Sequence, residues 1–378
     1  MIRLTHEQIA WCDEHAEEAI DLLRVLGRIP APSHHEEQRA AFVADWLRRQ
    51  GAQGVYIDQA GNVIYPYQAE ENAPVAVLMA HMDVVFPDTT PLPLREEGEN
   101  MYAPGIGDDT ANLVALLMAA KYLAQCKPAL AHGLLIVANV CEEGLGNLKG
   151  SRQIMEDFAG RVKELISLDG GMERITNRAV GSHRMKVTIH AQGGHSYSRF
   201  GNTNAIVQMA DLITRLYQKE PPTSARTTYN VGVIEGGTTV NSICAQCSML
   251  YEFRSESREC LAEMDAFFQK TIGDLRAAGV QVDVEVLGIR PCNGDVDPAR
   301  LRELTDRATD ILHTVTGREI RENAGSTDAN MPLSLGVPAV TIGAVDGGLA
   351  HTLEEWIHKP SLRLGQQVAM MTVLQYAE

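Results

Sequence analysis

Short apolar runs without alternation constrain the fold of this chain most. They occupy residues 75–80, 133–140, 164–169 and 338–343. Runs of this kind are typical of strands that are covered on both faces. Segments with helical periodicity separate them, for example at 36–51 and 110–125. Strands that alternate with helices predict an α/β fold with a mostly parallel sheet and helices on both faces.

The first of these helices has a start signal of its own. Ser33 and Glu36 form the pattern S-x-x-E directly before the helical segment. This spacing is typical of a capping box, in which both side chains bind backbone N–H groups of the first turn. We therefore expect Ser33 to cap the helix.

The pattern changes in the middle of the chain. Residues 184–191 alternate strictly, and helical and strand-like segments follow up to about residue 288. The order β-α-β-β-α-β is that of a ferredoxin-like domain. Buried-strand and helix patterns resume afterwards. We therefore predict a catalytic domain at 1–181 and 289–378, interrupted by an inserted α+β lid or dimerisation domain at 182–288.

Charge and cysteine content exclude several classes of function. With 33 Lys and Arg against 49 Asp and Glu, the net charge is −16, which argues against binding to nucleic acids or to anionic membranes. The first 20 residues lack the apolar core of a signal peptide. Seven scattered cysteines favour a reducing, cytoplasmic location. Cys244 and Cys247 form a lone C-x-x-C in a strand-like run, and we interpret them as ordinary thiols.

Acidic residues and histidines follow the ends of the apolar runs. Because ligands of open α/β sheets bind beyond the carboxyl ends of the strands, these positions predict one shared crevice. In chain order, the five features are His81-Met82-Asp83, Asp108-Asp109, Glu142-Glu143, Asp169-Gly170-Gly171 and His351.

Each feature also has a purely structural explanation. Asp83 can cap a turn, and the Asp108-Asp109 pair lies where helix N-termini favour aspartate. Glu142-Glu143 fits a solvated turn, and a single His351 fits the surface. A structural explanation of the whole set, however, needs five coincidences at one edge of one sheet. We therefore interpret the set as functional.

The residue types indicate metal chemistry. Carboxylates that lie close together require protonation or a cation. Histidines with carboxylates form a ligand set that suits Zn, Mn or Co better than Ca or Mg. Two such ions about 3.5–4 Å apart can share a carboxylate and a hydroxide. A remaining carboxylate can then act as the general base.

These motifs resemble the co-catalytic dinuclear zinc exopeptidase family of peptidase T, carboxypeptidase G, aminoacylase-1, succinyl-diaminopimelate desuccinylase and carnosinase. The resemblance covers nearly the whole chain, including an inserted lid before the last histidine. It implies that Asp108 bridges two Zn²⁺ ions (or Mn²⁺ or Co²⁺), that Asp83 orients a ligand, and that Glu142 is the general base. The implied metal ligands are His81, Asp108, Glu143, Asp169 and His351.

The resemblance also assigns residues to the substrate. It implies that His195, in Gly193-Gly194-His195-Ser196, stabilises the oxyanion across a homodimer interface formed by the lid. The implied substrate-binding residues are Asn241, Arg254, Ser326 and Thr327. A position on the solvent-exposed face of a strand would equally explain Arg254, and a helix cap would explain the Ser326-Thr327 segment.

Two positions depart from the pattern of many relatives. Thr110-Ala111-Asn112 replaces a Lys-Gly-Gly segment, and residue 169 is Asp where several deacylases have Glu. The aspartate favours the peptidase T branch. The predicted function is thus a zinc exopeptidase, aminopeptidase-like, that cleaves di- or tripeptides. An N-acyl-amino-acid deacylase with the same site is the nearest alternative, and a non-catalytic binding protein on this fold is a remote one.

Overall fold

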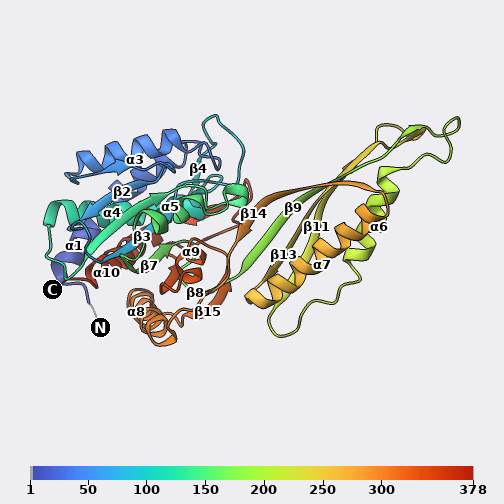
Figure 1. Ribbon diagram of the computed structural model, residues 1–378. Coiled ribbons are helices and arrows are strands. Elements are labelled where there is room, and N and C mark those ends of the chain that lie inside the picture. Colours follow the sequence, from blue (N-terminus) through green and yellow to red (C-terminus); the bar gives the residue numbers. More distant parts are fainter. Residues whose placement is uncertain (1–2, 378) are drawn as a thin grey trace. The chain divides into compact units, whose positions relative to one another are not determined.

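The computed structural model describes residues 3–377 and contains two compact units (Figure 1). One unit consists of the chain up to Ala179 and from Gly294 on, and the other is Val180–Asn293. The inserted domain predicted from the sequence, 182–288, is slightly shorter than this second unit. Among the described residues, no helix is long and apolar enough to cross a membrane.

The first unit is built on a mixed sheet of eight strands. Its central run β6-β3-β7-β16 is parallel, whereas β1, β2 and the β8-β15 pair join it through antiparallel neighbours. The predicted mostly parallel α/β fold is therefore confirmed. In sheet order, the strands are β1 (Tyr56–Ile57), β2 (Val63–Tyr67), β6 (Gly133–Asn139), β3 (Val75–His81), β7 (Val162–Leu168), β16 (Ala339–Ile342), β8 (Arg174–Ala179) and β15 (Arg321–Gly325).

Helices cover both faces of this sheet. Leu78 and Ala80 of β3 join one apolar cluster, while their neighbours Val77 and Met79 join another, because successive side chains point to opposite faces. The first face is covered by α1 (His6–Glu14), α2 (Ala16–Leu26), α3 (Glu37–Arg49), α4 (Asn112–Cys126), α8 (Pro298–Thr316) and α10 (Ser361–Leu374). The second face is covered by α5 (Lys149–Asp157) and α9 (Asn330–Ser334).

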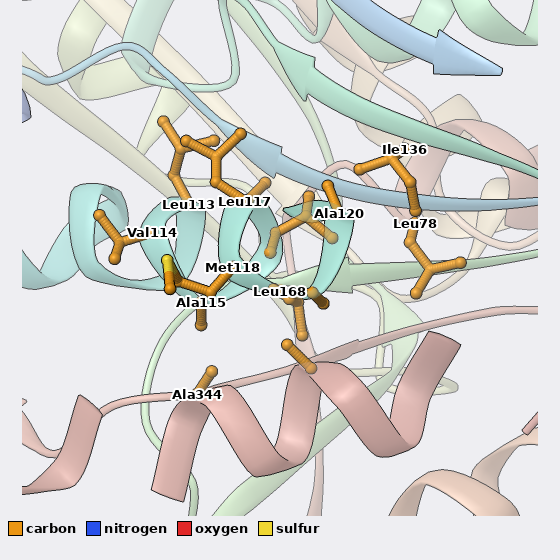
Figure 2. Close-up of a cluster of buried hydrophobic side chains, with 14 of the residues drawn as sticks. Leu78, Leu113, Val114, Ala115, Leu117, Met118, Ala120, Ile136, Leu168 and Ala344 are labelled. Carbon is orange, nitrogen blue, oxygen red and sulfur yellow. The ribbon is translucent and has the colours of Figure 1, made fainter. Parts of the chain in front are cut away.

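Helix α4 lies in the core rather than at the surface. Figure 2 shows Leu113, Leu117 and Ala120 of this helix in one apolar cluster with Leu78, Ile136 and Leu168, which come from three strands. A helix that is apolar all round is stable only when it is buried. This packing holds the first turn of α4 in place, directly after the aspartate pair at 108–109.

The predicted capping box before α3 is wrong. Glu36 is the residue before the helix, but its side chain caps nothing there; its Oε1 accepts the backbone N–H of Cys141 at 3.0 Å. The Ser33 hydroxyl instead donates to Asp83 at 2.6 Å. Both side chains serve distant loops, so the spacing that suggested a cap arises from tertiary contacts.

A small antiparallel sheet completes the first unit. It borders the loop that carries residue 108. Its strands, in order, are β17 (Gly347–Gly348), β18 (Trp356–His358), β5 (Asn100–Tyr102) and β4 (Arg95–Glu97).

The second unit has the ferredoxin-like order that the sequence predicts. Its antiparallel sheet runs β11-β13-β9-β14, and Val187 of β9 and Met249 of β13 pack with Leu212 of α6 and Phe268 of α7. A two-stranded ribbon, β10 (Gly194–His195) with β12 (Ser242–Ile243), belongs to the same unit. The main elements are β9 (Gly181–His190), α6 (Ala205–Leu216), β11 (Thr227–Gly236), β13 (Gln246–Ser255), α7 (Arg258–Ala277) and β14 (Gln281–Arg290).

Candidate metal centre

The site begins where the parallel strands end. His81 is the last residue of β3 and lies opposite Asn139, the last residue of β6. Asp169 follows directly after β7, the neighbour of β3 on its other side. Since parallel strands present their carboxyl ends at one edge, His81 and Asp169 come together although they are 88 positions apart in the sequence.

Three overlapping groups of potential metal ligands lie at this edge. Within each group, one nitrogen or oxygen atom per residue lies within 4.8 Å of the others. Asp108 belongs to two of the groups, one with each histidine. The groups are His81, Asp108 and Asp169; Asp108, Glu143 and His351; and His81, Glu142 and Glu143.

Direct contacts link the two histidines through carboxylates. His81 Nε2 lies 3.2 Å from one oxygen of Asp108, and His351 Nε2 lies 3.0 Å from its other oxygen. His351 Nε2 also lies 3.1 Å from Glu143 Oε1. Asp108 therefore stands between two nitrogen donors, which is the arrangement required of a bridging carboxylate.

Asp83 is fully buried behind this cluster. Its two oxygens accept the backbone N–H groups of Glu142 and Glu143, at 3.0 and 2.9 Å. The Ser33 hydroxyl donates to it as well, and its Oδ1 lies 3.5 Å from His81 Nδ1. Although burial opposes ionisation, the contacts with His81 and the hydrogen bonds hold the pKa of Asp83 below its ordinary value. Asp83 thus fixes both His81 and the glutamate pair.

Glu355 holds the loop that carries Asp108. Its carboxylate accepts the backbone N–H groups of Gly105, Gly107 and Asp108, at 3.0, 2.7 and 2.7 Å. The peptide bond between Asp108 and Asp109 is cis. Only 2 % of Glu355 is exposed, and this burial raises its pKa to about 7 in spite of the three donors.

Asn112 connects three loops of the site. Its side-chain amide donates to the carbonyl oxygens of Gly107 and Gly170, each at 3.2 Å, and its Oδ1 accepts the N–H of Ala344 at 2.6 Å. The first two loops carry Asp108 and Asp169. Asn112 is fully buried, so each of these hydrogen bonds replaces water that cannot reach it.

The charges at the centre are arranged for a cation. Burial, together with the nearby charge of Asp108, raises the pKa of Asp169 to about 7. Hydrogen bonds to Asp108 and Glu143 raise the pKa of His351 to about 10. Asp169 and His351 therefore bind protons more readily here when no other cation neutralises the cluster. The donor set of imidazole nitrogens and carboxylate oxygens fits Zn²⁺ or Mn²⁺ and is poor for Ca²⁺.

Four residues that support the site were not found by sequence reasoning. Ser33 and Glu355 come from distant parts of the chain, and Asn112 was noted only as a departure from relatives. Asn139 donates to the buried carboxylate of Asp328 at 2.6 Å. The one available signal for Asn139 was its place as a polar residue inside the apolar run 133–140.

The second unit carries three of the sequence-predicted residues. His195 is exposed on β10, and its Nδ1 accepts the N–H groups of Tyr197 and Ser198, at 3.3 and 3.4 Å. The ring proton therefore lies on Nε2, which makes this nitrogen a hydrogen-bond donor. Asn241 Oδ1 accepts from the Thr239 hydroxyl at 2.8 Å.

Arg254, on β13 of the same unit, is already paired. Its Nε and Nη2 donate to the two carboxylate oxygens of Glu252 at 2.9 and 3.0 Å. This fork occupies two of its five N–H donors.

Ser326 and Thr327 follow β15 in the first unit, and both are half-buried. The Thr327 hydroxyl lies 2.7 Å from that of Thr341, and its N–H donates to Asn330. The neighbouring Asp328, held by Asn139, adds negative charge near Asp169. This segment therefore lies close to the candidate metal centre.

Comparison with known proteins decides the family. A profile of Peptidase family M20/M25/M40 matches residues 77–375. The chain belongs to this family. It is therefore a metallo-hydrolase, as the resemblance of its motifs implied.

Individual relatives of this M20 protein differ in substrate. It is 28% identical to succinyl-diaminopimelate desuccinylase of Corynebacterium glutamicum over 89% of this chain and 90% of that one. A tripeptidase from Staphylococcus aureus has a TM-score of 0.73 at 20% identity, covering 94% and 97%. A dinuclear metal-binding M20 peptidase from Bacillus subtilis has a TM-score of 0.66 at 16% identity, covering 96% and 99%.

Proposed function

We propose that this M20 hydrolase uses two zinc ions to cleave one amide bond of a small peptide. The observation that supports this most is the position of Asp108, whose two oxygens face one histidine each. His81 and Asp169 would hold one ion, and Glu143 and His351 the other. When bound, the ions supply a Lewis acid that polarises the scissile carbonyl and lowers the pKa of water.

Glu142 acts as the general base in this proposal. Its backbone is fixed by Asp83, and its carboxylate lies within the group formed with His81 and Glu143. The Glu142 carboxylate accepts a proton as water adds to the carbonyl carbon. It then returns this proton to the amide nitrogen, so that the C–N bond breaks and an amine and a carboxylic acid are released.

His195 donates to the oxyanion of the tetrahedral intermediate. This role is supported by its tautomer, because two backbone N–H groups at Nδ1 leave the proton on Nε2. Asn241, Arg254, Ser326 and Thr327 remain predicted contacts of the substrate.

We also propose that the second unit forms a homodimer. Its edge strand β11 exposes Val233 and Ile234, and the adjacent α6 exposes Ile206 and Val207. An unpaired strand edge with exposed apolar side chains is a template for pairing with a second copy.

The seven free cysteines support a location in a reducing compartment such as the cytoplasm.

The substrate class separates two versions of this proposal. The tripeptidase among the structural neighbours supports an aminopeptidase-like enzyme, and the desuccinylase among the relatives supports an N-acyl-amino-acid deacylase. Turnover of trialanine and of N-acetylalanine by the zinc-loaded protein, before and after chelation, tests both. Faster chelator-sensitive cleavage of trialanine supports the peptidase. Faster cleavage of N-acetylalanine supports the deacylase.

A catalytic role would be contradicted if the fully metal-loaded protein cleaves neither compound and also cleaves no member of a wider panel of peptides and acyl amino acids. That result would favour a binding protein on the M20 fold.

A further inference from the structure

A pocket of about 310 Å³ adjoins the candidate metal centre in the first unit. Asp108 and Asp169 belong to its wall, so a molecule in the pocket lies beside the proposed ions. Other parts of the wall come from the segment after Gly171, from the small sheet and from residues beside it. The residues that matter here are Asp108, Asp169, Glu173, Arg174, Leu349 and Trp356.

Two charged groups of this wall, Asp346 and Glu355, already have several hydrogen-bond partners. Asp346 accepts two hydrogen bonds from Arg318, both at 2.6 Å. Glu355 accepts three backbone N–H groups. These two carboxylates therefore have little capacity left for a ligand in the pocket.

Arg174 differs from them. It is the first residue of β8, its side chain is 54% exposed, and its nearest carboxylate, Glu173, lies 4.0 Å away. No hydrogen bond of its guanidinium is formed within residues 3–377. An exposed pair at this distance contributes little energy, so the planar fork of Arg174 remains available.

The guanidinium of Arg174 lies close to the turn that follows Asp169. It lies against Gly170, where a Cβ atom would be 3.2 Å from Nη2. Gly170 also has a φ of 80°, which favours glycine, and it directly follows Asp169. The Arg174 guanidinium therefore lies beside the turn that carries Asp169, at the pocket wall.

We propose that Arg174 binds a carboxylate of the substrate in this pocket and thereby selects substrates that carry one. The inference rests on the hydrolase function proposed above and names a substrate class for it. Leu349 and Trp356 supply apolar surface for the carbon atoms that connect this carboxylate to the scissile bond. Arginine suits this task because its fork can bind both carboxylate oxygens.

Two kinds of carboxylate could occupy the pocket, and matched substrates distinguish them. One is a carboxylate in the acyl part or side chain, and the other is the free α-carboxylate. The substrates for this test are chosen from the class, peptides or N-acyl amino acids, that the wild type hydrolyses. For a peptidase, Ala-Glu-Ala is compared with Ala-Gln-Ala and with Ala-Glu-alaninamide. For a deacylase, N-succinylalanine is compared with N-succinamylalanine and with N-succinylalaninamide.

The test measures kcat/KM for R174Q, R174K and the control R49Q. Arg49 is exposed on α3 and makes no ion pair within the described residues, so R49Q removes the same charge outside the pocket. In one of the comparisons, we expect the kcat/KM of the wild type to be about 10- to 100-fold higher for the substrate with the carboxylate than for its carboxamide partner. The difference should arise from a lower KM, because charge-assisted hydrogen bonds strengthen binding by about this much. R174Q should abolish this preference, R174K should keep part of it, and R49Q should retain it.

The outcomes are separable. Retained cleavage of the carboxamide by R174Q shows that the variant is folded, and the comparison that loses its preference identifies the carboxylate. The role of Arg174 would be overturned by any of three results. The wild type shows no preference for the carboxylate, or the preference survives in R174Q, or R174Q loses kcat/KM equally on the carboxylate substrate and on its carboxamide partner. No cleavage of any substrate by the zinc-loaded wild type would instead contradict the proposed function itself.

Discussion

At the scale of residues, two adjacent glutamates have different proposed tasks. Glu143 contacts His351 directly, whereas Glu142 is grouped with His81 beside it. Both backbone N–H groups are bound by the single carboxylate of Asp83. One buried residue thus fixes the proposed ligand and the proposed base relative to each other, which is how supporting residues tune metal sites.

Replacement of Glu142 by Gln should separate catalysis from metal binding. The amide cannot accept the proton from water, so we expect kcat to fall about 10²- to 10⁴-fold, the range for loss of a general base. Metal content should stay unchanged. Steady-state kinetics with elemental analysis measures both quantities.

The control for this variant is Glu156→Gln, which changes an exposed glutamate of α5 in the same chemical way. It should behave as the wild type. Turnover in Glu142→Gln that equals the control would remove Glu142 from the mechanism.

At the scale of elements, the site depends on loops that are bound to one another. Asn112, at the start of α4, holds the loops of residues 107, 170 and 344. Asn112→Ala should therefore weaken metal binding about 10- to 100-fold, as other losses of supporting contacts do. Competition with a chromogenic chelator measures the affinity.

Asn177→Ala is a matched control for this prediction. Asn177 is also buried, but its amide donates to Glu322, away from the metal centre. Its loss should lower the free energy of unfolding without changing metal affinity. Equal metal affinities of the two variants would mean that Asn112 acts only on stability.

A second element-scale prediction concerns pH. Hydrogen bonds from Arg24 of α2 and from Lys359 lower the pKa of Glu96, on β4, from 4.5 to about 2. Because the folded-state pKa is the lower one, this stabilisation is present above pH 4.5 and is lost as the pH falls toward 2. Glu96→Gln should unfold more easily at pH 6, by roughly 1 kcal/mol for a partly exposed network.

Calorimetry at several pH values tests this expectation. The difference between Glu96→Gln and the wild type should shrink as the pH falls, whereas Glu97→Gln, on the same strand but more exposed, should stay within about 0.5 kcal/mol throughout. A difference that is independent of pH would show that Glu96 contributes by packing alone.

Sequence patterns were sufficient for the strands and for the residues at their ends. The apolar runs correspond to β3, β6, β7 and β16, and polar residues that follow them meet at one edge. The supporting contacts could not be predicted, because Glu355 binds Gly105 across 250 residues and no local periodicity reports such a bond. The capping box predicted at Ser33 is wrong for the same reason, since its hydroxyl binds Asp83, 50 positions away, and a local pattern cannot report this.

At the scale of the whole molecule, the open question is which subunit uses His195. The proposed dimer allows an exchange test with two inactive variants, His195→Ala and Glu142→Gln. If His195 acts in the partner's site, a hybrid dimer has one site with both residues intact. Random exchange should then restore about a quarter of wild-type activity, since half of the dimers are hybrids with one working site of two.

Light scattering and native mass spectrometry must accompany this assay. Hybrid dimers that form without recovery of activity would place His195 in the site of its own chain. A monomer with full activity would contradict the role of the dimer altogether.

The central claim is that two metal ions share Asp108, and counting ions per chain tests it most directly. The wild type should bind two zinc ions, and His351→Ala should bind one, because His351 belongs only to the group with Asp108 and Glu143, which is one of the two proposed ion sites. His358→Ala, which alters a partly exposed histidine paired with Glu99, should still bind two. A wild type that binds fewer than two ions, or a His351→Ala variant that still binds two, would contradict the account.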